Sequence, residues 1–349
     1  MLSISVMKKI INPVCLIGLL LFISCASPDK RTDGTTTDSA AGRVEIYDST
    51  ALNGIRKDAV VEIIGRNYKW SEGPVWIPSK QVLLFSAVRE NKIYIWNGKD
   101  TPVAWLTPSG YTDTAIRNGE NGSNGLALDK DGKLLLCQSG NRQVVRMDAA
   151  LDSPMPKFIV LANNFRGKKF NSPNDLVADS RNNIYFTDPI YGLPEGEKDP
   201  TRELAFEGVY KINSAGKLSL LIDSIPHPNG ITLSPDEKIL YVGSSDQHTK
   251  WYAYHLDEKG DIQSGGIFLD GDPLLEKATV KTGADGFKTD QSGNVYSSGP
   301  DGINIISPAG KLLGLIRIYG KRTSNCCFNE TKDVLFITSD DRVLKVNLK

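Results

Sequence analysis

The feature that most constrains the fold of this 349-residue chain is a sequence pattern of two short strands that occurs six times. Each copy starts with a polar residue, usually followed by Gly, and continues through an apolar strand, a polar turn and a second β-rich strand. The copies begin at Glu72, Asn124, Asn174, Asn229, Asp285 and Asn325. Their starts are 52, 50, 55, 56 and 40 residues apart by subtraction. Such a period indicates a repeat architecture in which each copy is one supersecondary unit.

Two further strand-like segments follow most copies of this pattern. Examples of the third strand are residues 92–96 and 143–147, and examples of the fourth are 158–161 and 218–222. Six repeats of about four short strands predict an all-β fold, a six-bladed β-propeller with four-stranded blades. A β-sandwich would not explain a repeat of this length, and no helix-period segment of useful length interrupts the pattern.

The sixth copy contains only three strand-like segments, the last of which ends near Leu348. Residues 60–64, Val-Val-Glu-Ile-Ile, precede the first copy and have the apolar character of a strand. We therefore expect this N-terminal strand to complete the last blade and close the ring, which removes exposed sheet edges.

The N-terminus resembles an export signal. Lys8 and Lys9 precede an apolar stretch over residues 10–24, which is too short to span a bilayer but suits a signal peptide. Ser24 followed by Cys25 resembles a bacterial lipoprotein signal, in which Cys25 is lipidated after cleavage; the alternative is an ordinary cleaved signal. We predict a signal peptide over 1–24, a flexible tether over 25–42 and the propeller over 43–349.

These features predict an exported protein of the periplasm or cell envelope that touches a membrane only through its lipid anchor. With 41 Lys and Arg against 41 Asp and Glu, the formal net charge is zero. Nucleic-acid binding, which needs a basic face, is therefore not expected. The three histidines are scattered, and no Cys/His cluster has zinc spacing.

The six polar residues that start the copies fall in one register. In a propeller, equivalent positions of every blade lie at equal radius, so these oxygens should converge on the central channel. Asn and Asp before Gly are also favoured turn formers, but Glu72 is a poor one and Asn174 lacks the Gly. Oxygen donors without His or Cys suit Ca²⁺, with Mg²⁺ or Mn²⁺ as alternatives, and a partly open ion could polarise a carbonyl or phosphoryl oxygen.

At these motifs the chain resembles the SMP-30/gluconolactonase/LRE-like family, which includes regucalcin, and in particular the exported bacterial gluconolactonases. The resemblance spans the mature chain. The segments that carry it are 171–175 (Asn-Ser-Pro-Asn-Asp), 185–189 with Tyr191-Gly192, Asn229-Gly230 before 234–236, and 284–286 with 298–302.

The resemblance implies a metal-dependent hydrolase that opens a sugar lactone such as glucono-1,5-lactone. It implies one divalent cation, usually Ca²⁺, with Mg²⁺, Mn²⁺ or Zn²⁺ as alternatives. By motif match the metal ligands are Glu72, Asn174, Asn229 and Asp285. Asp285 is also the catalytic residue, either activating water or attacking directly. Asp175 is implied beside the metal, and Asn124 and Asn325 are implied substrate contacts.

Several alternatives stay open at this point. Family members often carry Arg or His where this chain has Ser172 or Ser139, at positions expected to set specificity. Related propellers hydrolyse aryl esters or phosphotriesters, and a propeller can also be a non-catalytic ligand-binding protein. His227 is a further candidate for substrate binding, whereas Trp70 is expected to pack between blades.

Overall fold

The computed structural model describes residues 40–115 and 117–349, and Ala40–Lys349 form one compact unit. The predicted signal peptide, Cys25 and residues 26–39 of the predicted tether lie outside the described residues. Strand β1 already begins at Gly42, the last residue assigned to the tether. Within the described part of the chain, no helix is long and apolar enough to cross a membrane.

Apart from one two-stranded ribbon, the described strands group into six sheets, called blades 1 to 6 in the order of the repeats. Blade 1 contains β3 (Ser71–Ile77), β4 (Val82–Ala87), β5 (Lys92–Trp96) and β6 (Val103–Leu106). Blade 2 contains β7 (Ser123–Leu128), β8 (Leu134–Gln138), β9 (Gln143–Met147) and β10 (Phe158–Ala162). Blade 3 contains β13 (Leu176–Ala178), β14 (Ile184–Asp188), β15 (Gly208–Ile212) and β16 (Leu218–Ile222).

The remaining blades include the two N-terminal strands. Blade 4 contains β17 (Pro228–Leu233), β18 (Ile239–Ser244), β19 (Lys250–Leu256) and β20 (Ile262–Asp270). Blade 5 contains β21 (Phe287–Thr289), β22 (Val295–Gly299), β23 (Gly302–Ile306), β24 (Leu312–Ile318) and β1 (Gly42–Ile46). Blade 6 contains β25 (Thr323–Phe328), β26 (Val334–Ser339), β27 (Arg342–Asn347) and β2 (Val61–Arg66).

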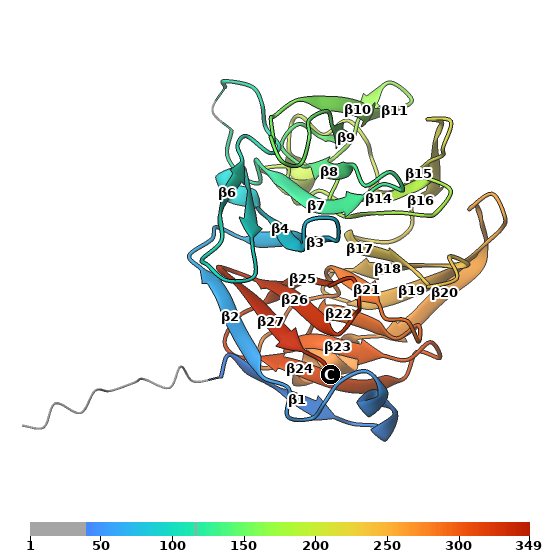
Figure 1. Ribbon diagram of the computed structural model, residues 1–349. Helices are drawn as coiled ribbons and strands as arrows, with labels where there is room; N and C mark the ends of the chain where they lie inside the picture. Colours follow the sequence, from blue (N-terminus) through green and yellow to red (C-terminus); the bar gives the residue numbers. More distant parts are fainter. Residues whose placement is uncertain (1–39, 116) are drawn as a thin grey trace, which may run out of the picture. The chain divides into compact units, whose positions relative to one another are not determined.

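The first strands of the blades form the inner wall of a closed ring. They contact one another in the circuit β3–β7–β13–β17–β21–β25–β3, while the later strands of each blade follow outward as antiparallel neighbours. The blades succeed one another around this circuit in chain order (Figure 1). The predicted six-bladed β-propeller is therefore confirmed.

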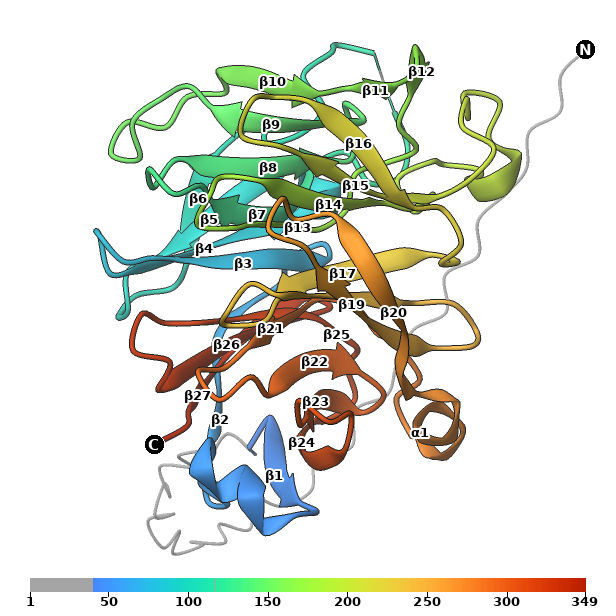
Figure 2. The same ribbon diagram turned by 90° about the vertical axis from the view of Figure 1, so that its right-hand side faces the viewer.

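The ring is closed by strand β2, as the sequence predicted. β2 runs antiparallel to β27, with Ile63 opposite Leu344, so the N-terminal strand becomes the outer strand of blade 6. Strand β1 was not predicted. It pairs with β24, placing Val44 opposite Ile316, and gives blade 5 a fifth strand (Figure 2). The N-terminal segment therefore ties two neighbouring blades together.

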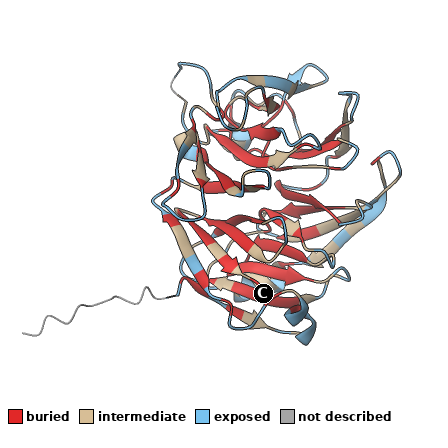
Figure 3. Cartoon of the chain, in the orientation of Figure 1, coloured by how far each residue is buried: buried red, intermediate tan, exposed pale blue. Residues whose placement is uncertain are grey.

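The hydrophobic core is divided among the six interfaces between neighbouring blades. Between blades 1 and 2, for example, Leu84 packs in one cluster with Leu126 and Leu136. Each sheet is thus covered on both faces, and all five residues of β8 are buried. The inner and middle strands are mostly buried, whereas the loops and parts of the outer strands, such as β20, are exposed (Figure 3). This explains why the strands read as continuous apolar runs rather than strict alternation.

The polar turns between the first two strands of the blades share a hydrogen-bond pattern. Asp129 Oδ1 accepts the amides of Asp131 and Lys133 at 3.0 and 2.8 Å. Such a side chain replaces the missing backbone acceptor in a tight turn. The same role is played by Asp179, Asp290 and Asn329.

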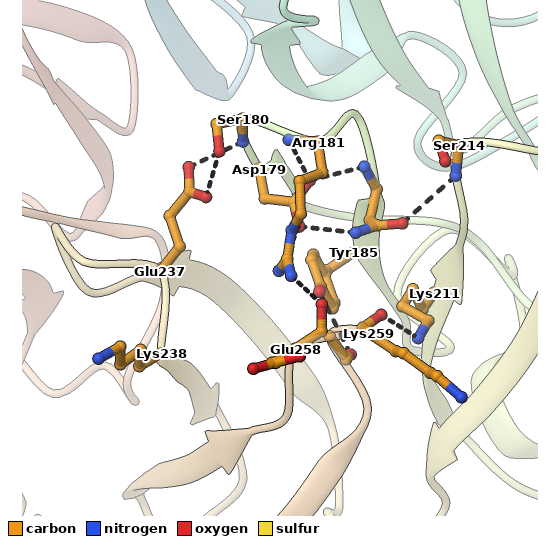
Figure 4. Close-up of polar contacts among 12 residues, drawn as sticks. Asp179, Ser180, Arg181, Tyr185, Lys211, Ser214, Glu237, Lys238, Glu258 and Lys259 are labelled. Atoms are coloured by element: carbon orange, nitrogen blue, oxygen red, sulfur yellow. Dashed lines mark hydrogen bonds and ion pairs between the residues drawn. The ribbon is translucent and has the colours of Figure 1, made fainter.

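Polar contacts also join neighbouring blades away from the axis. The hairpin between β19 and β20 of blade 4 reaches blade 3, where Lys211 Nζ donates to the carbonyl of Lys259 at 3.0 Å and Arg181 donates to the carbonyl of Glu258 (Figure 4). These bonds satisfy backbone groups of the hairpin. They hold the two blades together without using the residues at the inner ring.

Short elements lie in the connections between the strands, both within and between blades. They are the 3-10 turns η1 (Ser49–Asn53), η2 (Val88–Glu90) and η3 (Gly196–Lys198), the ribbon of β11 (Asn164–Phe165) and β12 (Lys168–Lys169), and helix α1 (Asp272–Lys277). Helix α1 follows β20 (Figure 2) and contributes to the cavity described below.

We expect a chain that begins at Tyr68 to lose its cooperative fold, because blade 6 then lacks its outer strand. This truncation also removes six buried side chains, those of Ala41, Val44, Ala51, Ile55, Ala59 and Val61. A buried aliphatic side chain contributes about 1–3 kcal/mol, whereas a whole domain is stable by about 5–15 kcal/mol. Circular dichroism melting is the measurement, and a chain that begins at Ala40 is the control. A single sharp transition at the control temperature would contradict this role of β2.

We expect Glu45→Gln to destabilise the protein by about 1 kcal/mol at pH 7. Glu45 in β1 accepts bonds from Arg317 Nε and Nη2 at 2.7 and 3.1 Å, and this guanidinium lowers the pKa of Glu45 to about 2. A lowered carboxyl pKa stabilises the fold above the usual value of about 4.5, and this contribution is lost as the pH falls toward 2. Urea denaturation should therefore show a difference between wild type and variant that shrinks below pH 4.5. Glu62→Gln on β2 is the control, and a difference that does not change with pH would count against the ion pair.

Candidate active site

The six polar residues predicted to share a register lie at the start of the six inner strands. Glu72, Asn124, Asn229 and Asn325 belong to β3, β7, β17 and β25. Asn174 and Asp285 each lie two residues before the inner strand of their blade, β13 and β21. All six are at least nine-tenths buried. The fold therefore brings the oxygen-bearing side chains of all six blades to the same end of the inner ring.

A local irregularity in the inner strands accompanies these side chains. The register of β3 with β4 shifts between Glu72 and Val75, and that of β17 with β18 shifts between Pro228 and Ile231. The pairs β7–β8 and β25–β26 shift at the equivalent place. A bulge interrupts the regular alternation of side chains between the two faces of a strand. Here the bulges occur at the oxygen-bearing residues of the inner ring.

The glycine that follows most of these residues is required by the neighbouring blade. Gly73 has a φ of +48°, and a Cβ there would lie 2.0 Å from the carbonyl oxygen of Asn124. At Gly286, a Cβ would lie 1.9 Å from the side chain of Asn325. The Asn-Gly and Asp-Gly pairs were open to interpretation as simple turns. They instead allow adjacent inner strands to approach closely.

A cavity of about 740 Å³ opens over this end of the ring. Its lining includes the four predicted metal ligands Glu72, Asn174, Asn229 and Asp285, together with Asn124. Loops and helix α1 supply the rest of the wall, among them Arg89, Glu120, Tyr191, Ser245, His248, Lys281 and Arg322. The structure thus gathers these five predicted residues around one space.

Asp175 and Asn325 do not line this cavity. Asp175 Oδ1 accepts the amide of Leu176 at 2.9 Å, and its other oxygen accepts Asn325 Nδ2 at 3.3 Å and faces Lys288 Nζ at 3.9 Å. Blades 3, 5 and 6 are thereby joined across the channel. The structure places both residues as supports beside the candidate ligands, without direct access to the cavity.

His227 also lies outside the cavity lining. Its ring pairs with Glu207, with 2.9 Å between Nδ1 and Oε1, and this carboxylate raises the pKa of His227. The imidazole packs against Tyr191 with 5.6 Å between ring centroids. His227 therefore supports a residue that does line the cavity.

Burial and mutual repulsion make the carboxylates of the cavity electrostatically unfavourable. Burial raises the pKa of Asp285 well above its usual value, and the charges of Glu72, Asp175 and Glu120 raise it further. Burial likewise raises the pKa of Glu72, although the amide of Gly73 donates to Glu72 Oε2 at 2.8 Å and opposes the shift. Several carboxyl groups in one desolvated place favour either protonation or a bound cation.

The donor set fits a hard divalent cation. Asp285 Oδ1 and Asn124 Oδ1 are buried and have no hydrogen-bond partner among the described residues. No cluster of three or more His, Cys, Asp or Glu side chains of metal-binding type occurs in the described part of the chain. The candidate set instead combines two carboxylates, Glu72 and Asp285, with the amides of Asn174 and Asn229. Carboxylate and amide oxygens are the ligands that Ca²⁺ takes in proteins.

Sequence reasoning missed several residues of the cavity. Glu120 lies in the loop before β7 and Arg89 in the turn η2 between β4 and β5, and neither position is part of the repeated pattern. Trp70 was expected to pack between blades, but it lines the cavity, and Arg322 stacks 4.8 Å from the centroid of its ring. Trp76 does pack between blades, stacked on Phe336.

Ser172 and Ser139, at the positions expected to set specificity, are buried beneath a loop. Ser172 Oγ donates to the carbonyl of Pro189 at 2.5 Å and accepts the amide of Gly192 at 2.9 Å. Ser139 Oγ donates to the carbonyl of Pro173 at 2.9 Å. Neither serine lines the cavity, but Ser172 fixes the loop that carries Tyr191.

Comparison with known proteins shows the family of the chain. Residues 70–341 match the family described as SMP-30/Gluconolactonase/LRE-like region. The chain belongs to this family. The chain is 36% identical over 293 residues to a gluconolactonase of Zymomonas mobilis. This match covers 83% of the chain and 81% of the relative.

Two further proteins similar to this chain are a lactonohydrolase and a gluconolactonase. A lactonohydrolase of Aspergillus oryzae is 27% identical over 270 residues, covering 69% of this chain and 59% of that protein. The solved structure of a gluconolactonase from Xanthomonas campestris superposes with a TM-score of 0.74 at 28% identity, covering 89% of this chain and 97% of that one.

We expect Asp285→Asn to stabilise the protein by about 1–3 kcal/mol once divalent cations have been removed with a chelator. The substitution removes a buried charge next to Glu72 and keeps the shape of the side chain. Urea denaturation in the presence of EDTA is the measurement. Asp257→Asn, in the β19–β20 turn, is the control and should change stability little. If Asp285→Asn instead lowers stability by about 1–3 kcal/mol, the carboxylates of the cavity do not repel one another.

Proposed function

We propose that this protein is a metal-dependent lactonase that opens a sugar lactone such as glucono-1,5-lactone, a carboxylic ester hydrolase. The observation that carries the proposal is the buried, unpartnered Oδ1 of Asp285 at the cavity, among amide and carboxylate oxygens from the other blades. Membership of a family with gluconolactonase relatives supports lactone hydrolysis over other ester chemistry.

Glu72, Asn174, Asn229 and Asp285 would hold one divalent cation, for which we propose Ca²⁺. When bound, the cation would supply positive charge that polarises the lactone carbonyl and stabilises the oxyanion that develops on it. The two carboxylates match a divalent charge, and the neutral amides do not weaken its pull on a substrate oxygen.

The protein's own groups position the substrate and move the protons. The lactone lies in the cavity with its carbonyl toward the inner ring. Asp285 accepts a proton from the attacking water while the water oxygen bonds to the carbonyl carbon. The bond between that carbon and the ring oxygen then breaks, the ring oxygen takes the proton that Asp285 had accepted, and the product is the open-chain hydroxy acid. Thr187 Oγ1 donates to the carbonyl of Asn229 at 2.7 Å and so fixes the backbone of one candidate ligand.

The decisive experiment is hydrolysis of glucono-1,5-lactone followed by proton release above the spontaneous rate. We expect activity that is lost in EDTA and restored by Ca²⁺. Asp285→Asn should lower kcat/KM by about 10²–10³-fold, because the base and a charged donor are both removed.

The same assay separates the alternatives. Asp257→Asn serves as the matched control and should retain wild-type activity. Preference for an aryl ester or a phosphotriester would make the protein a related hydrolase with the same ring. Activity that survives both EDTA and Asp285→Asn would sink the metal-dependent mechanism, and no hydrolysis of any of these substrates would favour a non-catalytic binding propeller.

We also propose that the chain is exported and anchored to the cell envelope through Cys25. The support is the N-terminal pattern of Lys8-Lys9, an apolar stretch and Ser24-Cys25. A cell-envelope location would expose the enzyme to sugar lactones outside the cytoplasm.

A further inference from the structure

Two polar atoms of the cavity play no part in the metal ligand set. Glu120 Oε2 and Tyr191 Oη are both buried. Asn124 interacts with Glu120 and Ser245 with Tyr191, but neither oxygen has a hydrogen bond of normal geometry among the described residues. Both side chains line the cavity. Buried polar atoms without partners are rare in folded proteins, and at a cavity wall a ligand is the natural partner.

Glu120 and Tyr191 face the same space as the catalytic Asp285. The charge of Glu120 contributes to the raised pKa of Asp285, and the charge of Asp285 raises the pKa of the Tyr191 hydroxyl beyond the effect of its burial. Arg89, another cavity residue, and Arg117 favour the charged form of Glu120, although burial raises its pKa. A ligand bound at Asp285 therefore lies within the electrostatic reach of both groups.

The loops that carry these two residues are fastened to each other. Arg117 Nη1 donates to the carbonyl of Glu120 at 2.8 Å, and Arg117 Nη2 donates to the carbonyl of Gly192, next to Tyr191. Asn121 Nδ2 closes the turn by donating to the carbonyl of Arg117 at 2.8 Å. One arginine thus links the loop before β7 to the loop after β14. Such fastening holds the two polar atoms in place before a substrate binds.

We propose that Glu120 and Tyr191 form a subsite for the hydroxyl groups of the substrate, which selects a polyhydroxylated lactone over an unsubstituted one. A carboxylate oxygen accepts and a phenol donates, and a hydroxyl group of a sugar can do both. The inference rests on the proposed lactonase function. It adds that specificity is set by loop residues on the wall, separate from the inner ring that performs the chemistry.

The test compares two six-membered lactones, glucono-1,5-lactone and δ-valerolactone, which lacks the hydroxyl groups. In Glu120→Gln and in Tyr191→Phe we expect kcat/KM for glucono-1,5-lactone to fall about 10- to 100-fold, the usual effect of removing a hydrogen bond at a desolvated site. For δ-valerolactone we expect less than about a threefold change, since it has no hydroxyl group to lose. Tyr210→Phe is the control, because its hydroxyl is also buried and unpartnered but lies in the core between blades 2 and 3.

A binding measurement separates this inference from the catalytic proposal. Calorimetric titration with 1,5-anhydro-D-glucitol, a cyclic polyol without a carbonyl, should give a Kd that rises about tenfold or more in either cavity variant but not in Tyr210→Phe. Equal losses on both lactones, or unchanged values in both variants, would overturn the subsite while leaving the lactonase in place. If the wild type hydrolyses neither lactone, the proposed function fails. The polyol titration then decides the subsite on its own, and unchanged polyol affinity in the variants would overturn it.

Discussion

The structure depends on how closely the backbones of the inner strands approach one another at the axis. The amide of Gly125 donates to the carbonyl of Asn174, and the amide of Gly286 donates to that of Ser324, each at 2.7 Å. These bonds link neighbouring blades and leave no room for a side chain at the glycines. The same approach crowds oxygen-bearing side chains into one desolvated place. The packing that closes the ring therefore also creates the functional site, at a cost in stability that the six apolar interfaces offset.

The fold and the inner ring of the site could be predicted because they repeat. A residue such as Asn229 is ambiguous alone, but five equivalents in the same register make its position in the ring predictable. The closing strand was predictable for a related reason, since the last blade lacked one strand and an apolar segment stood unused before Glu72. The family motifs then added roles to positions that the repeat had already aligned. The fold is confirmed, whereas those roles stay predictions.

The rest of the site could not be predicted because it lies in loops that differ between blades. Glu120 and Tyr191 reach the cavity through contacts made by Arg117, which no periodic pattern indicates. Trp70 has a positive φ of 64°, a local conformation that its sequence neighbours did not reveal. Strand β1 (Gly42–Ile46) was not predicted because it is short and follows the linker-like segment directly, and because its pairing depends on an edge of blade 5 formed about 270 residues later. Such long-range contacts follow from tertiary structure rather than from local sequence.

The partnership of β2 with β27 has a consequence for how the molecule is made. Ile63 pairs with Leu344, about 280 residues later in the chain, so blade 6 cannot assemble until the strands of the other five blades have been synthesised. Closing a loop of this length is entropically costly and slow, and the unfinished ring presents open strand edges in the meantime. The topology therefore delays completion of the fold until the last strands have been synthesised, and an incompletely folded chain is the state that the proposed export would require.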